Sequence, residues 1–224
     1  MDAPFVLLRR VFAASVLALS LARPVAASVC VDAQVRPTGL PLNRVVLDSM
    51  MSEAAAIWAP YGVVIRWTDG VSSDRCRSAD SSVAVQVDNA TPGRPPSARA
   101  LILGTTRVAS SGAGPVPIRV DYSAVDRLLG SLTAAKLGQI IGREQLAPSD
   151  VGRALGRVLA HEIGHVLLVG SGHPRRGLMR AYFLPSELVD YRRRAYTLSS
   201  AEVPRLAERA ARHRQTPDEA ITND

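Results

Sequence analysis

Three of the four histidines in this 224-residue chain lie within thirteen residues, in the segment HEIGHVLLVGSGHPRRGLM (161–179). His161 and His165 are four residues apart, so on a helix both imidazoles project from one face and reach the same ion. Neutral imidazoles suit zinc, and two histidines with one further ligand leave a fourth position open to water. The spacing therefore predicts a zinc site carried by a helix.

Glu162 adds a group that a purely structural metal site does not need. It follows His161 directly and lies near enough to the same side of a helix to polarise a bound water without being a ligand. The ion makes such a water a nucleophile near neutral pH, and the carboxylate accepts its proton. We therefore predict that Glu162 is catalytic.

The helix that must carry these residues is predicted over about 150–169, with Ser149 and Asp150 marking its start. Apolar residues surround most of its circumference: Val151, Leu155, Val158, Leu159, Ile163, Val166 and Leu167. A helix that is apolar nearly all round is buried, so histidine and glutamate side chains on it are costly unless they have partners. A metal ion is one such partner, and a set of hydrogen-bonded core histidines is the alternative.

This segment resembles the metzincins, zincin-type zinc endopeptidases with H-E-x-x-H-x-x-G-x-x-H followed by a methionine turn. The first two ligands and the catalytic glutamate correspond to His161, His165 and Glu162. The helix-ending glycine, the third ligand and the turn methionine correspond to Gly170, His173 and Met179. The resemblance implies a zinc metallopeptidase with one catalytic Zn2+ that hydrolyses a peptide or protein substrate by a zinc-bound water activated by Glu162.

The match departs from the family in its spacing. His173 lies eight residues after His165, where the family has six, and the glycine is displaced by two as well. Two more residues require about half a turn more helix or a wider loop. Gly170 and Gly172 supply backbone freedom for that reversal, with Gly170 in the left-handed conformation that ends a helix.

Two assignments have alternatives. Glu187 lies 22 residues beyond His165, and thermolysin-like enzymes use a downstream glutamate as the third ligand in place of a histidine such as His173. Met179 is alternatively a plain core methionine. Tyr182 comes three residues after Met179, where some metzincins place a tyrosine that helps at the metal two residues after the methionine.

The order of predicted elements defines the fold class. Strands are expected at 28–35, 63–67, 82–88, 99–108 and 116–122, with a helix over about 40–62 after the first strand, stopped by Pro60 and Gly62. Weaker helical stretches follow at 123–131 and 132–145, and a last helix is expected near 200–213, where Ser199 and Glu202 have the pattern of a capping box. We predict an α+β, zincin/metzincin-like fold: a mixed twisted sheet of about five strands, an N-terminal helix, a buried active-site helix and a mainly helical C-terminal part. In such a fold an edge strand, here 99–108, lies over the cleft and pairs with an extended peptide.

The chain begins like an exported protein. Residues 1–27 have arginines, then a short apolar core, then small residues, the layout of a signal peptide cleaved after Ala27. The rest, 28–224, is expected to be one domain without a membrane span, secreted or periplasmic. In that compartment Cys30 and Cys76 are expected to form a disulfide bond.

The charge constrains the partners. The formal net charge is +7 with only one lysine, and ten of the arginines follow residue 174. No aromatic-interleaved motif accompanies them, so we expect a solvated basic face, no nucleic-acid partner and a monomer. The predicted function is that of a secreted zinc-dependent endopeptidase. The alternatives are a zinc-binding protein without peptidase activity that binds a polyanion or partner through its Arg-rich face, and an enzyme that cleaves another bond, such as a cell-wall cross-bridge.

Overall fold

A computed structural model describes residues 29–39, 41–68, 79–89, 102–108, 114–137, 146–170 and 172–215. Within these ranges the elements follow in the order β1 (Val29–Gly39), α1 (Arg44–Trp58), the 3-10 turn η1 (Ala59–Tyr61), β2 (Val63–Trp67), β3 (Ser81–Asn89), β4 (Gly104–Thr106), β5 (Val116–Asp121), α2 (Tyr122–Leu137), α3 (Pro148–Leu167), α4 (Pro185–Val189) and α5 (Glu202–Gln215).

The strands form one mixed sheet in the order β2-β1-β3-β5-β4. The first four run parallel, and β4 pairs antiparallel with β5 at one edge, with Thr106 opposite Ile118. In β3, Val83, Val85 and Val87 are buried, as expected where alternate residues face the core. The α+β class and the five strands predicted from the sequence are confirmed.

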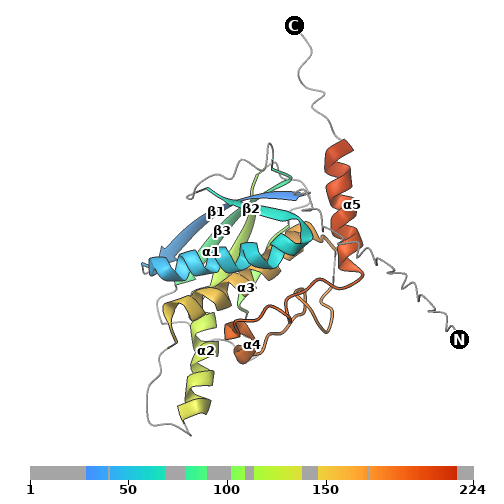
Figure 1. Ribbon diagram of the computed structural model, residues 1–224. Helices are drawn as coiled ribbons and strands as arrows, with labels where there is room; N and C mark the ends of the chain where they lie inside the picture. Colours follow the sequence, from blue (N-terminus) through green and yellow to red (C-terminus); the bar gives the residue numbers. More distant parts are fainter. Residues whose placement is uncertain are drawn as a thin grey trace, which may run out of the picture.

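Helices α1 and α3 lie side by side over one face of this sheet (Figure 1). Their close approach depends on Gly156 of α3, where an added Cβ would lie 2.6 Å from the backbone oxygen of Met50 and 2.7 Å from Cβ of Glu53. Trp58 at the end of α1 is fully buried and donates from Nε1 to the backbone oxygen of Ala160 (3.1 Å). The core therefore lies between the sheet and a helix pair whose α3 member carries the histidine motif.

The ends of α1 follow from local chemistry. Asn43 precedes the helix, and its side-chain oxygen accepts a hydrogen bond from the backbone N–H of Val45 (2.8 Å). Pro60 lies in the 3-10 turn, and Gly62 adopts φ +73° before β2 starts. The predicted stop at these two residues is confirmed.

Several boundaries differ from the prediction. Helix α3 starts at Pro148, two residues before the predicted start, because proline suits the first helical position. The stretches 123–131 and 132–145 were expected as two helices, but α2 is continuous across residue 131; residues 138–145 lie outside the described ranges. The prediction of a mainly helical C-terminal part is wrong, since only α4 and α5 interrupt irregular chain over the described residues after α3. Pro174 and the glycines near His173 explain the irregular backbone directly after α3, because they disfavour continued helix.

The predicted signal peptide, 1–27, lies outside the described residues. None of the described helices combines the length and the apolar character that crossing a membrane requires. Cys30 is disulfide-bonded. Cys76 lies outside the described ranges, so the Cys30–Cys76 pairing stays a prediction.

Candidate metal centre

His161, Glu162 and His165 lie on the buried helix α3, as the sequence predicted. His161 and Glu162 are only 7% and 5% exposed, His165 is half-buried and His173 is exposed. The site thus has a buried floor formed by α3 and an accessible side formed by the segment after it.

The three histidines converge on one point. Nε2 of His165 lies 3.1 Å from Nε2 of His161 and 3.3 Å from Nε2 of His173. All three ligand atoms lie within 4.8 Å of one another. Two nitrogens bound at roughly 2.0–2.1 Å to one tetrahedral ion are about 3.3 Å apart. The separations between these nitrogens therefore fit a single small cation, and the three residues lie close enough to bind a metal ion.

The backbone after the motif orients one of these rings. Nδ1 of His161 lies 2.8 Å from the carbonyl oxygen of Leu178. A carbonyl only accepts, so His161 carries its proton on Nδ1 and directs the lone pair of Nε2 toward the other two histidines. The ring also meets the edge of Phe183, with centroids 5.5 Å apart. The hydrogen bond from Nδ1 to a backbone carbonyl is typical of histidines that bind a metal through Nε2.

Met179 packs directly beneath the motif. It is fully buried, and a Cβ added at Gly164, between His161 and His165 on α3, would overlap its sulfur. Both a turn methionine and a plain core methionine would be buried in this way, so its role stays a prediction. Tyr182 is 69% exposed.

The chain reverses between His165 and His173 as the glycines predicted. Helix α3 ends at Leu167, and Gly170 adopts φ +75°, the left-handed conformation expected for it. Two arginines of α5 hold the end of α3: Arg209 donates to the carbonyl oxygen of Val166 (3.2 Å), and Arg205 donates to that of Val169 (2.6 Å). These carbonyls belong to the last turn of α3 and to the turn that follows it, where cations are favourable.

Glu162 is enclosed between α3 and the edge strand β4. Its Oε2 accepts a hydrogen bond from the hydroxyl of Thr106 (2.7 Å). Burial raises the pKa of Glu162 to about 7, and the Thr106 hydrogen bond opposes part of that rise. A carboxylate that titrates near neutrality is suited to accept and return a proton.

The pKa values of two of the histidines, His161 and His165, are lowered rather than raised. Burial lowers the pKa of His161 to about 4, although its bond to Leu178 acts against this shift. Burial and the neighbouring His173 also lower the pKa of His165. Both rings are therefore neutral near pH 7, the state in which imidazole binds a metal.

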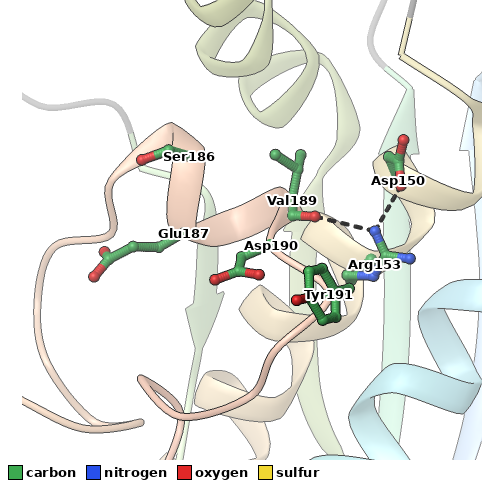
Figure 2. Close-up of a pocket in the computed structure, with 7 residues that line it drawn as sticks. All are labelled: Asp150, Arg153, Ser186, Glu187, Val189, Asp190 and Tyr191. Carbon is green, nitrogen blue, oxygen red and sulfur yellow. Dashed lines mark hydrogen bonds and ion pairs between the residues drawn. The ribbon is translucent and has the colours of Figure 1, made fainter.

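Glu187, the alternative third ligand, is engaged elsewhere. Its Oε2 accepts from the Arg180 guanidinium (2.7 Å) and from the backbone N–H of Leu184 at the start of α4 (3.0 Å). It also lines a pocket of about 520 Å³ beside α4, formed by Asp150, Arg153, Ser186, Glu187, Val189, Asp190 and Tyr191. Figure 2 shows its carboxylate pointing away from Arg153, which bonds to Asp150 and to the Val189 carbonyl. The motif histidines do not line this pocket.

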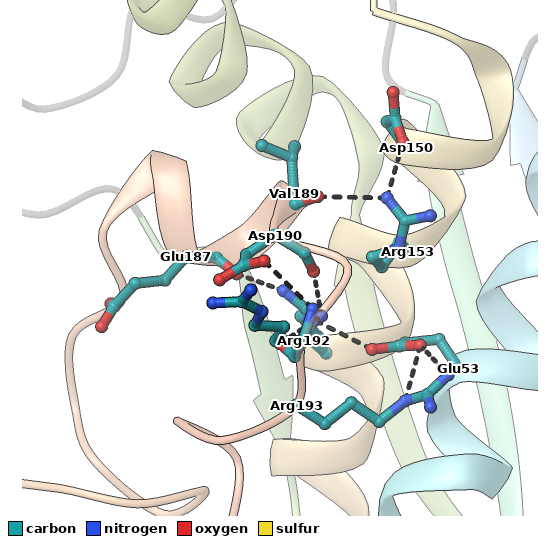
Figure 3. A network of polar contacts seen from close by, with 9 residues as sticks. Glu53, Asp150, Arg153, Glu187, Val189, Asp190, Arg192 and Arg193 are labelled. Carbon is teal, nitrogen blue, oxygen red and sulfur yellow. Dashed lines mark hydrogen bonds and ion pairs between the residues drawn. The ribbon is translucent and has the colours of Figure 1, made fainter.

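A buried ion pair ties α3 to α1 and to the loop after α4. Arg157, one turn before His161, is fully buried and donates to Glu53 of α1 (2.9 Å) and to the carbonyl oxygens of Glu187, Asp190 and Arg192. Glu53 also pairs with Arg193 (2.7 Å), as Figure 3 shows. Each charge has several partners, which is the condition for a buried ion pair to be tolerated.

Sequence reasoning missed these contacts and misjudged part of the basic face. Thr106, Glu53 and Arg157 carry no motif that would have identified them. Three of the late arginines are partly buried and bind within the protein, so the expectation of a solvated basic face is wrong for Arg180, Arg205 and Arg209. The amphipathic pattern of α5 was a hint that some of its arginines contact the protein, but no local sequence feature identified the residues that they bind.

Comparisons with known proteins add little. No protein-family model and no curated protein matches the chain. One similar solved structure is described as the GM1-bound form of the ECX AB5 holotoxin. The alignment covers 82% of this chain and 81% of that chain, with 17% identity and a TM-score of 0.44. A similarity at this level carries no argument about what this chain does.

Proposed function

We propose that this protein is a zinc-dependent endopeptidase. The observation that carries the proposal is the combination of three converging histidines with a buried glutamate, next to one of them, whose pKa is about 7. A structural metal site needs the histidines but not the glutamate. Hydrolysis needs both, because a proton must leave the attacking water and reach the departing amine.

The assignment of roles follows from the donor set. His161, His165 and His173 would hold the ion, and three neutral nitrogens with an open fourth position favour zinc. Bound there, zinc would supply Lewis-acid polarisation of the peptide carbonyl and a lowered pKa of water. Glu162 would take the proton from the attacking water on its carboxylate and deliver it to the leaving amine nitrogen, while Leu178 keeps His161 in the ligand tautomer.

The metzincin-like fold belongs to the same proposal. In its support, a parallel sheet ends in one antiparallel edge strand, β4, that lies against the helix carrying the motif. An extended substrate would add to this edge by backbone hydrogen bonds, which sets its orientation without requiring a particular side chain. A peptide substrate is therefore favoured over a compact small molecule.

The decisive test compares wild type with Glu162→Gln. Glutamine keeps the size of the side chain but cannot accept a proton, so the variant should bind about one zinc and lose roughly 10²- to 10⁴-fold in kcat on peptides selected from a library. Zinc content is measured by mass spectrometry and cleavage by chromatography. A Glu162→Gln protein as active as wild type would remove the catalytic role. Zinc-loaded wild type that cuts no peptide would favour a binding protein, and cleavage of cell-wall cross-bridges alone would favour the third hypothesis.

Export is part of the proposal. Mature protein should begin at Ser28 and contain a Cys30–Cys76 bond, because the first 27 residues have the layout of a signal peptide. Intact-mass analysis of extracytoplasmic material measures both features. Retention of residues 1–27 or two free thiols would contradict export in this form.

A further inference from the structure

Two residues of β4 contact Glu162 from the same side of the strand. Gly104 and Thr106 are two residues apart, so their side-chain positions face the same way, here toward α3. The Thr106 hydroxyl reaches the Glu162 carboxylate, and a Cβ added at Gly104 would lie 2.7 Å from the other carboxylate oxygen, Oε1. The strand at the sheet edge therefore forms one wall of the space around the glutamate.

The Thr106 hydroxyl has one proton and two acceptors within reach. Oε2 of Glu162 lies 2.7 Å away and the backbone oxygen of Glu162 lies 3.1 Å away. The shorter distance and the charge of an ionised carboxylate favour donation to Oε2. With Oε2 held, the rotation of the carboxylate is restricted and Oε1 is the oxygen that remains for a proton.

Because Gly104 has no side chain, the Glu162 side chain can lie directly against the strand, with Oε1 close to this residue. A Cβ at this position would also lie 2.9 Å from Cγ of Glu162 and 2.9 Å from Cγ1 of Val158. Contacts that short require the glutamate or the strand to move. The two residues thus concern different oxygens of one carboxylate: the Thr106 hydroxyl bonds to Oε2, and Gly104 leaves room for Oε1.

The backbone of the same two residues faces the open edge of the sheet. Leu103 and Arg107 use their backbone groups to pair with β5, through the N–H of Asp121 (2.9 Å) and the carbonyl of Pro117 (3.2 Å). Backbone pairing alternates along an antiparallel strand, so Thr105 also pairs with β5, whereas Gly104 and Thr106 direct their N–H and C=O groups outward. Among the described residues, no strand covers that edge.

We propose that Thr106 is a positioning residue for Glu162 and that β4 links the register of a bound peptide to the orientation of the glutamate. This inference rests on the proposed peptidase function. The backbone N–H and C=O groups of Gly104 and Thr106 hold the substrate strand. The Thr106 hydroxyl and the missing side chain of Gly104 determine how the Glu162 carboxylate, which must accept the proton, is oriented. A shift of the substrate by one residue would place its carbonyl away from Oε1.

The first experiment uses three variants of the zinc-loaded protein. Thr106→Val removes the hydroxyl at nearly constant volume, Thr106→Ser retains it, and Thr105→Val removes a hydroxyl from the exposed neighbouring position as a matched control. Thr106→Val should keep zinc and lose about 10- to 100-fold in kcat with KM little changed, because the groups that bind the peptide are backbone groups. Thr106→Ser and Thr105→Val should stay within about threefold of wild type. A Thr106→Ser protein as impaired as Thr106→Val, or unchanged kcat in Thr106→Val, would overturn the positioning role.

The second experiment does not depend on activity. Urea unfolding of the metal-free protein at pH 8 is compared for Thr106→Val in the wild-type and the Glu162→Ala backgrounds. The substitution should lower the midpoint more in wild type than in the Glu162→Ala background, where the hydroxyl reaches only the backbone oxygen of residue 162, whereas Thr105→Val should behave alike in both. Equal shifts for Thr106→Val in the two backgrounds would show that the hydroxyl does not act through Glu162. If zinc-loaded wild type cuts no peptide, the peptidase proposal fails, and this cycle alone decides whether Thr106 holds the glutamate.

Discussion

Nδ1 of His161 lies 2.8 Å from the carbonyl oxygen of Leu178, the residue directly before the buried Met179. This single contact joins the metal-binding helix to the chain segment that follows His173. It also determines which nitrogen of His161 is free for a metal. The segment after the third histidine thus contributes to the site through its backbone, independently of its side-chain sequence.

The ligand assignment makes the first prediction. His161→Ala, His165→Ala and His173→Ala should each lose zinc, because each removes one of three converging nitrogens. Glu187→Ala should keep zinc, since that carboxylate is bound by Arg180 and by the start of α4. Metal content after dialysis is measured by mass spectrometry. Loss of zinc in Glu187→Ala with retention in His173→Ala would instead support a thermolysin-like ligand set.

The part of the site that could be predicted from the sequence is local. The helical period alone brings His161 and His165 together, and Gly170 predicted the reversal that returns the chain to His173. These relations span at most eight residues between neighbouring ligands. Because these relations depend only on residue type and on short spacings along the chain, they could be recognised in the sequence.

The rest depends on contacts between distant segments. Thr106 is 56 residues from Glu162 in sequence, and Glu53 is 104 residues from Arg157. Which residue of an edge strand faces which residue of a helix follows from sheet register and helix packing, neither of which a single sequence specifies. The hydrogen bond to the Leu178 carbonyl could not be predicted either, because every residue has a backbone carbonyl and the residue type does not show which one is used.

The buried ion pair gives the second prediction. Glu53→Gln should destabilise the protein by about 3–5 kcal/mol, because it leaves the Arg157 charge buried without its carboxylate partner. Asp48→Asn on the same helix removes an exposed pair with Arg44 and should change the stability by less than about 0.5 kcal/mol. Urea denaturation measures both. Similar losses for the two variants would contradict the importance assigned to burial.

The contact between α5 and α3 gives the third prediction. Arg209→Met keeps the apolar stem but removes the bonds to the Val166 carbonyl and to Ser81, so the end of the metal-binding helix should be less well ordered. Zinc affinity should fall by roughly tenfold, the lower end for groups that support metal ligands indirectly. Competition with a chelator measures it, and Arg212→Met, at an exposed position one turn further along α5, is the control. Equal affinity for wild type and Arg209→Met would exclude this support.

The pKa of Glu162 gives the last prediction, for metal-free protein. Burial raises that pKa from an ordinary 4.5 to about 7, so between these values the folded state binds more protons than the unfolded state. The contribution of Glu162 to stability is therefore present below about pH 4.5 and is lost as the pH rises through about 7. Glu162→Gln has no such proton to lose, so its stability relative to wild type should increase from pH 5 to pH 8 by up to about 3 kcal/mol.

The lowered pKa values of His161 and His165 act on wild type and variant alike and cancel in the difference. Urea unfolding in the presence of a chelator measures that difference, and a value that does not change with pH would mean that the carboxylate is solvated rather than enclosed by β4.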